Sequence, residues 1–279
     1  MTSKTSRSLI ATGLAALLFV PLAEAKPPKK PRKPKPGQNQ QQQQETAKPE
    51  NAPAPVAQQT PPPGLEAVEG RLWHFQTGEA RSTVQKFSDQ ADKNAYVAMA
   101  MGRVLEQEKK YGEAEGQLRK ATELAGNDPA PFVYLGETYL RQRKDGEASD
   151  AFRKAADLAR AKGGGEASYY LGVSQQRLKQ YDDAISTLQG ARAPEPALIP
   201  YQLGVTQAFK QNWSAALEQL NRAIDMDSGL AYAYYYRAIA QDKLGRKDQL
   251  VNDMNRFLAL APNAPEAEQA RAILRAVKR

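Results

Sequence analysis

The chain has 279 residues with no cysteine, one histidine and a formal net charge of +8. The lack of cysteine excludes a disulfide framework, a thiolate nucleophile, a cysteine-based metal site and a lipidated cysteine. With His74 as the single histidine there is no multi-histidine metal site, and any Ser-His-Asp triad would depend on that residue.

Residues 1–25 have the features of a secretory signal peptide. Lys4 and Arg7 precede an apolar run over residues 9–20, and a small-X-small cleavage site ends at Ala25. We expect cleavage after this site and a periplasmic protein that is not a lipoprotein. The alternative is an uncleaved anchor, although the run is shorter than the about 20 residues of a spanning helix.

Residues 26–64 form a basic linker rich in proline and glutamine. They hold seven lysines and arginines against two glutamates, so most of the net charge lies here and the rest of the chain is nearly neutral. Such a segment buries too little apolar surface to fold, and we expect it to be disordered. It is interpreted as a spacer, or alternatively as an electrostatic tether of residues 26–48 to an anionic envelope surface. A nucleic-acid partner is not expected, because no aromatic residues interleave with the lysines.

A repeated pattern follows the linker. Anchor residues recur at intervals of 34, 36, 32 and 34 residues, and they are Gly102, Gly136, Gly172, Gly204 and Ala238. An alanine stands 12 and 19 residues after each glycine, with leucine or phenylalanine between the two alanines. These alanines are Ala114, Ala121, Ala148, Ala155, Ala184, Ala191, Ala216 and Ala223.

The residue types have a packing explanation. Each unit contains two helical stretches separated by turn signals, and a regular period of this length is typical of stacked helix pairs. Small residues at the anchor and at the alanine positions let the two backbones approach closely, and the large residue fills the space beside them. The pattern continues weakly backward to Val68, and an amphipathic stretch over residues 264–279 is suited to capping the stack.

The pattern resembles the tetratricopeptide repeat (TPR) family, with a Leu-Gly pair in the first helix and an Ala, a bulky residue and an Ala in the second. The resemblance implies an all-α, right-handed solenoid of about five to six helix pairs with a C-terminal capping helix. We expect a degenerate first helix pair over residues 65–94, five repeats over residues 95–263 and the cap over residues 264–279. The last repeat departs from the signature at Arg237, Leu250 and Phe257.

The resemblance also implies a concave groove lined by the first helix of each pair. Its offsets from the anchors place the following side chains on an exposed concave face, where they would bind a partner: Tyr96, Met99, Arg103, Val133, Glu137, Tyr169, Val173, Gln176, Tyr201, Val205, Tyr232, Tyr235 and Ile239.

Three tyrosines share one offset in this predicted groove: Tyr169, Tyr201 and Tyr235. Tyrosine combines a large contact face with a hydroxyl, which suits a binding surface. Co-chaperones of the family clamp a terminal carboxylate with lysine and asparagine at such positions, and the different residues here favour an apolar extended or helical segment as ligand. The alternative is that the tyrosines only pack between neighbouring units.

The sequence contains no catalytic constellation. His74 lies between aromatic residues in the weak first unit and is interpreted as structural or solvent-facing, and the paired aspartates lie at turns. Gly163-Gly164-Gly165 lacks the preceding strand and the Lys-Ser/Thr of a phosphate loop. We therefore expect no cofactor and no metal.

These features predict a non-enzymatic scaffold or assembly factor of the bacterial cell envelope that binds another protein in its groove. An alternative is an anchoring protein that acts through its basic tail, with the repeats as spacer or oligomerisation module. An enzyme dependent on His74, and a cytoplasmic nucleic-acid adaptor with an unused signal, are less favoured. A further hypothesis is that the proline-rich tail itself occupies the groove.

Overall fold

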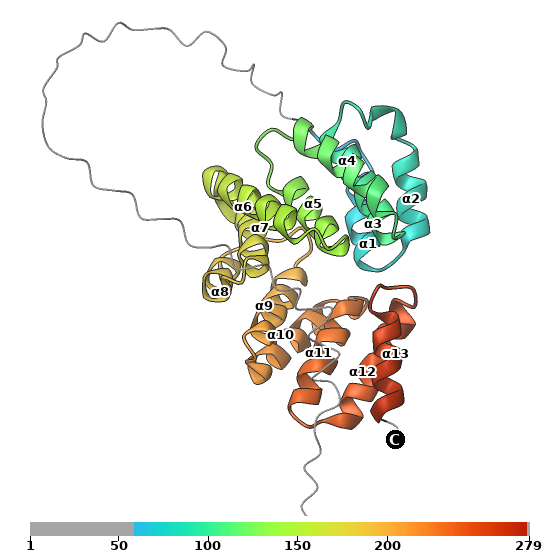
Figure 1. Cartoon of the computed structure of the whole chain (residues 1–279), viewed down its shortest axis with the longest axis vertical. Coiled ribbons are helices and arrows are strands. Elements are labelled where there is room, and N and C mark those ends of the chain that lie inside the picture. The colour runs from blue at the N-terminus through green and yellow to red at the C-terminus, as the bar shows by residue number, and fades with distance from the viewer. Residues whose placement is uncertain (1–58, 278–279) are drawn as a thin grey trace, which may run out of the picture.

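The computed structural model describes residues 59–277, and within this range it contains thirteen α-helices, one 3-10 turn and no strand (Figure 1). The expected signal peptide, most of the linker and the last two residues lie outside the described residues. The prediction of an all-α solenoid of stacked helix pairs is confirmed.

Consecutive helices pack against each other in pairs, and α13 follows the last pair. The helices are α1 (Ala67–Trp73) and α2 (Thr77–Gln85), then the 3-10 turn η1 (Ser88–Gln90), then α3 (Ala95–Gln107) and α4 (Tyr111–Leu124), α5 (Ala130–Arg141) and α6 (Asp145–Lys162), α7 (Gly164–Arg177) and α8 (Tyr181–Gln189), α9 (Leu198–Phe209) and α10 (Trp213–Met226), α11 (Ala231–Lys243) and α12 (Lys247–Leu260), and finally α13 (Ala267–Val277).

The same turn joins the two helices of every pair. Shortly after each first helix one residue adopts a left-handed conformation, and the next backbone N–H donates to the carbonyl five residues earlier, as from Lys110 N to Leu105 O at 2.9 Å. This is the Schellman arrangement that ends many helices. The left-handed residues are Phe75, Lys109, Arg143, Lys179, Gln211 and Gly245.

The anchor glycines lie where the two helices of a pair cross. A Cβ added to Gly102 would lie 2.6 Å from Leu118 Cγ, and one added to Gly204 would lie 2.6 Å from Leu220 Cγ. The large residue between the alanines thus fills the space that the glycine leaves. Ala191 differs from the equivalent alanines of the other repeats in two respects: it lies beyond the end of α8, and it is only half-buried.

The later repeats share one long hydrophobic core from Ala98 to Leu274, but the first pair has a core of its own. In that smaller core, Leu72 of α1 and Val84 of α2 pack with Val104 of α3. The first pair is thus held on α3 by contacts that are separate from those of the main core.

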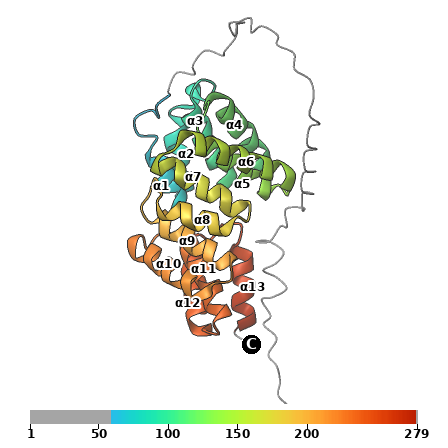
Figure 2. The ribbon, with the colours of Figure 1, turned by 90° about the vertical axis from the view of Figure 1, so that its left-hand side faces the viewer.

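The solenoid curls back on itself. Figure 1 shows the chain running from α1 and α2 through α6 and α8 to α10 and then returning, so that α13 and the loop before it lie beneath the first helix pair. Figure 2 shows the same stack from the side. This curvature brings the first pair close to α9 and α11.

The end of the linker is held against α3. Gln59 Oε1 accepts a hydrogen bond from the backbone N–H of Ala95 at 2.6 Å, and Asn94 Nδ2 donates to the carbonyl of Thr60 at 3.2 Å. The expectation of disorder up to residue 64 is therefore wrong for residues 59–64, because this segment satisfies unpaired groups at the start of α3.

Candidate functional site

The concave face is formed by the first helices α3, α5, α7, α9 and α11. Most of the side chains predicted to line an exposed groove are buried on it: Met99, Val133, Tyr169, Val173, Gln176, Tyr201, Val205, Tyr235 and Ile239. Four are half-buried: Tyr96, Arg103, Glu137 and Tyr232. The expectation of exposure is wrong for the first nine, while a role of this face in binding stays a prediction.

Neighbouring helices account for part of this burial. Tyr201 on α9 contacts Tyr236 on α11 edge to face with ring centroids 6.2 Å apart, and Tyr235 contacts Phe257 at 5.0 Å. Such edge-to-face and tilted arrangements are favourable for aromatic rings. Burial raises the pKa of the Tyr169 hydroxyl to about 12, so this group stays neutral at physiological pH.

The corner between α1 and α2 covers another part of the face. We call its three residues, Trp73, His74 and Phe75, the hook. The ring of Trp73 lies edge-on to Tyr201 at 6.1 Å, and the ring of Phe75 lies 5.7 Å from that of Tyr232. The hook therefore occupies the section of the groove in front of α9 and α11. Residues 26–58 of the tail, which we considered as an occupant, lie outside the described range, and the described end of the tail at Gln59 and Thr60 borders the pocket at the start of α3 instead.

A polar contact completes the hook. His74 Nε2 lies 2.8 Å from Asp227 Oδ2 in the loop after α10, and the His74 ring lies against Gly229. Arg103 adds a cationic neighbour, with its guanidinium carbon 5.7 Å from the centroid of the Trp73 ring. The three hook side chains are half-buried. His74 thus joins two segments that are distant in the chain.

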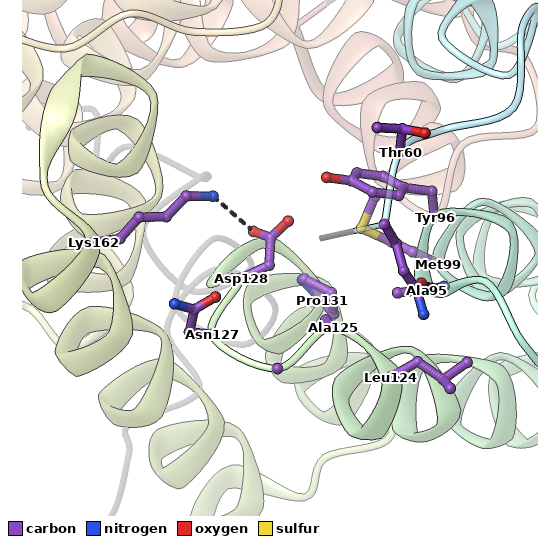
Figure 3. A pocket seen from close by; sticks show the side chains of 12 residues that line it. Thr60, Ala95, Tyr96, Met99, Leu124, Ala125, Asn127, Asp128, Pro131 and Lys162 are labelled. Carbon is purple, nitrogen blue, oxygen red and sulfur yellow. Dashed lines mark hydrogen bonds and ion pairs between the residues drawn. The ribbon is translucent and has the colours of Figure 1, made fainter. Parts of the chain in front are cut away.

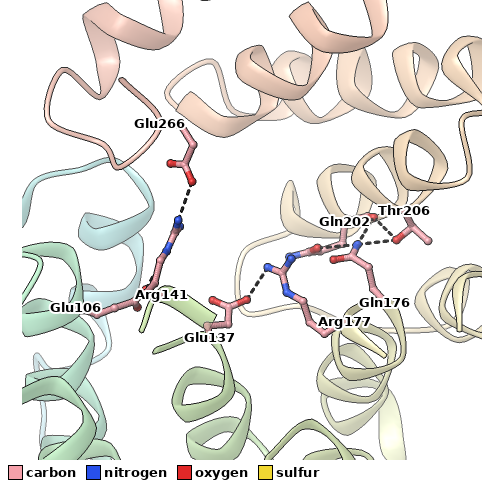
Figure 4. A network of polar contacts seen from close by, with 8 residues as sticks. All are labelled: Glu106, Glu137, Arg141, Gln176, Arg177, Gln202, Thr206 and Glu266. Atoms are coloured by element: carbon pink, nitrogen blue, oxygen red, sulfur yellow. Dashed lines mark hydrogen bonds and ion pairs between the residues drawn. The ribbon is translucent and has the colours of Figure 1, made fainter. Parts of the chain in front are cut away.

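Ion pairs cross the interior of the curled solenoid (Figure 4). Arg141 Nη1 donates to Glu266 Oε1 at 2.7 Å, and Arg141 Nε lies 3.8 Å from Glu106 Oε1. Arg177 Nη2 donates to Glu137 Oε1 at 2.7 Å. Arg141 connects α5 to the loop before α13, so it supports the same curvature as the hook.

One carboxylate of this network lacks an arginine of its own. Glu106 shares Arg141 with Glu266, and burial raises the pKa of Glu106, an effect to which the nearby carboxylates add. Burial also opposes the charge on Glu137, but Arg177 outweighs burial and the pKa of Glu137 is lowered. The two carboxyls differ because one has a dedicated cation and the other does not.

Polar side chains continue the network on α7 and α9. Gln176 Nε2 donates to Thr206 Oγ1 at 2.7 Å and to the carbonyl of Gln202 at 3.2 Å, and Thr206 Oγ1 donates to the same carbonyl at 2.7 Å. Because Gln176 is buried, its amide group links the two repeats instead of facing a ligand.

Part of the concave face stays open. A pocket of about 250 Å³ lies between the start of α3 and the α4–α5 loop (Figure 3). Tyr96, Met99 and Pro131 provide apolar surface, while Asp128 and Lys162, whose Oδ1 and Nζ atoms are 3.9 Å apart, provide charge. This pocket brings together two of the residues predicted to bind a partner, Tyr96 and Met99.

A smaller cavity lies beside the hook. It has a volume of about 100 Å³ and is bounded by Trp73 and Phe75 on one side and by Arg103, Glu106 and Tyr232 among others. Its lining is both aromatic and charged. The hook thus leaves unfilled space between itself and the concave face.

The arrangement is suited to binding by contact and hydrogen bonding. Histidine and carboxylates within residues 59–277 form no group of three or more that could hold a metal ion. None of the described helices is long and apolar enough to cross a bilayer. Sequence reasoning missed the hook, Arg141 and Glu266 as site residues. The one available signal was the pair of aromatic residues at the turn of the first unit, where polar residues are the usual choice.

Comparison with known proteins supports the fold. No family profile matches the chain. A segment of 105 residues, 37% of the chain, is 28% identical to sperm-associated antigen 1 of Mus musculus, and it spans only 11% of that protein.

Solved structures give a broader likeness. A thermophilic TPR protein of Thermus thermophilus matches 66% of this chain and 98% of its own with a TM-score of 0.52 and 18% identity. YrrB, described as a TPR protein with an unusual peptide-binding site, matches 68% of this chain and 97% of its own with a TM-score of 0.38 and 21% identity. At these identities the first likeness shows the fold, which is the TPR solenoid.

Proposed function

We propose that this chain, which has the TPR fold, is a non-enzymatic scaffold that binds a segment of another protein on its concave face. The observation that carries the proposal is the open pocket at the start of α3. Its apolar floor of Tyr96, Met99 and Pro131 and its charged edge at Lys162 combine contact area with polar groups that can orient a ligand. Its volume of about 250 Å³ is slightly below the range of about 300–1,000 Å³ for typical small-molecule pockets, and it suits side chains of a partner segment.

Photo-crosslinking in the native host tests this function. A benzoylphenylalanine probe at Tyr96 faces the pocket, and a matched probe at Arg153 on the exposed side of α6 serves as control. We expect a discrete protein adduct from the first position only, and a weaker adduct when Lys162→Glu reverses the charge at the pocket edge. Equal adducts from both positions, or none from Tyr96, would contradict binding in this pocket.

We further propose that the protein works in the periplasm after removal of residues 1–25. The basis is the sequence alone: a basic start, a short apolar run and a small-X-small site at Ala25. Sequencing the N-terminus of the protein purified from its host tests this. A start at Lys26 supports export, and a start at Met1 contradicts it.

A second function is favoured by the position of the charge. Seven cations and two acids in residues 26–64 would attract the chain to an anionic envelope surface, with the repeats as a spacer. Flotation with vesicles containing anionic lipid, in low and in physiological salt, tests this tether. A variant with Lys29, Lys30, Arg32, Lys33 and Lys35 changed to glutamine should lose the binding, and unchanged binding would exclude the tether.

A further inference from the structure

The hook is unusual among the six equivalent turns. Phe75 adopts the left-handed conformation with φ of 57°, and the same position holds Lys, Arg, Lys, Gln and Gly in the later units, with φ between 60° and 76°. A bulky side chain is disfavoured in this conformation, where glycine and asparagine are preferred. The turn itself therefore gives no reason for a phenylalanine, whereas the contact of Phe75 with Tyr232 does.

The hook contacts the concave face in the manner of a short bound peptide. Trp73 lies against Tyr201, and Phe75 lies against Tyr232. His74, which lies between the two aromatic residues in sequence, approaches Asp227 with its Nε2 atom 2.8 Å from Oδ2. The face thus provides an aromatic partner for each ring of the hook and an acidic partner, Asp227, for the residue between them in sequence.

The hook is also separable from the structure that supports it. The first helix pair packs on α3 through its own core of Val68, Leu72, Val84 and their neighbours, which contains no hook residue. Trp73 and Phe75 only border the main core as partly buried residues, and a cavity of about 100 Å³ lies beside them. None of the fully buried members of either core is thus a hook residue.

We propose that the hook is a resident occupant of a peptide-binding site, and that this site takes a partner segment of the form aromatic–X–aromatic with a hydrogen-bond donor or cation at X. The inference rests on the proposed function, since it names the chemistry of a partner on the same concave face. A tethered occupant has an effective concentration of the order of mM, so a partner must compete with the hook. A partner that carries the same groups in a better-fitting arrangement would displace it.

A labelled peptide of residues 68–78, VEGRLWHFQTG, is the probe. In fluorescence anisotropy with the full chain, we expect the variant Trp73→Ala/Phe75→Ala to bind it at least about 10-fold more tightly than the unmodified chain, because the positions of the two rings are vacant. Adding Asp227→Asn to the variant should weaken binding several-fold. A peptide with alanine in place of Trp and Phe should not bind. No saturable binding to the folded variant, or equal binding of the alanine peptide, would overturn the proposal.

A second measurement does not depend on the vacated variant. In the full chain with Trp213→Phe, Trp73 is the sole tryptophan and reports on the hook. Titration with an unlabelled peptide that has phenylalanine in place of tryptophan should shift the Trp73 emission to longer wavelength, with saturation at a concentration of the order of mM. An unchanged emission maximum would overturn displacement. Both peptide experiments could fail while the crosslinking probe at Tyr96 still gives an adduct. That combination would overturn only this inference and would leave the proposed function supported.

Discussion

His74 Nε2 and Asp227 Oδ2 lie 2.8 Å apart although 153 positions separate them in the chain. The contact links the first helix pair to the loop after α10, so it is present only while the solenoid stays curled. A contact of this kind reports on the closure of the whole molecule, while most other hydrogen bonds report on one repeat or on two neighbours.

A substitution at Gly229 tests the contact. A Cβ on Gly229 would lie 2.7 Å from His74 Cδ2 and 3.2 Å from Asp227 Oδ1, so Gly229→Ala should push the imidazole away and destabilise the chain by about 1 kcal/mol. In a His74→Ala background the same change should cost clearly less, because the crowded ring is absent. Thermal unfolding of the four chains measures the coupling. Equal costs in both backgrounds would mean that the imidazole does not hold this position.

The left-handed turn residues allow a paired test of the hook. Lys109→Gly should stabilise the chain by up to about 1 kcal/mol, because glycine relieves the left-handed strain and Lys109 is exposed. Phe75→Gly relieves the same strain but removes a half-buried ring and its contact with Tyr232, so we expect a net loss of about 1–2 kcal/mol. At about 2–4 °C per kcal/mol for a chain of this size, melting temperatures resolve the opposite signs. A gain from both substitutions would show that Phe75 adds nothing across the groove.

Glu106 predicts a pH dependence of stability. The pKa of Glu106 is higher in the folded chain than in the unfolded chain, so folding favours its protonated form. This side chain therefore disfavours folding least below the unfolded pKa of about 4.3, and it destabilises the fold increasingly as the pH rises through the folded-state pKa. Glu106→Gln should therefore raise the melting temperature by a few degrees at a pH of about 7 to 8, with a gain that shrinks towards a pH of about 4.

The control for this pH test is Glu123→Gln at an exposed position, where the substitution removes no buried charge. Melting curves of the three chains over a pH range of about 4 to 8 make the comparison, and only Glu106→Gln should differ more at the upper end. If Glu106→Gln instead lowers the melting temperature most at neutral pH, the pairing of Glu106 with Arg141 at 3.8 Å outweighs the cost of burying its charge.

Local features of the fold were predictable and the closure was not. The spacing of glycine, alanine and leucine predicts helix pairs, because the close approach of Gly204 to Leu220 is decided by residues only 16 positions apart. The meeting of Trp73 with Tyr201 depends on small rotations that accumulate over the intervening units. The sequence of a single repeat does not determine the total of these rotations, so the meeting could not be predicted from the repeat pattern. Tyr169, Tyr201 and Tyr235 were placed on the correct helices but wrongly expected to be exposed, and for Tyr201 the contact with Trp73 is part of the reason.

Two glycines test whether close helix crossing supports the stack. Gly204→Ala places a Cβ 2.6 Å from Leu220 Cγ and 3.2 Å from the Leu220 backbone nitrogen, so α9 and α10 must move apart, at a cost of about 1–3 kcal/mol. Gly116→Ala, in the middle of α4 with no atom within 4 Å of the added Cβ, should instead stabilise by about 0.5–1 kcal/mol through helix propensity.

The origin of the Gly204 effect can be traced with Leu220. Leu220→Ala alone should cost about 2–5 kcal/mol because it leaves a cavity in the core. Combined with Gly204→Ala, the total loss should be smaller than the sum, since the new methyl group enters the space that the leucine leaves. Chemical denaturation of the single and double variants measures this coupling. Additive losses would mean that the added methyl group meets the backbone of α10 and not the Leu220 side chain.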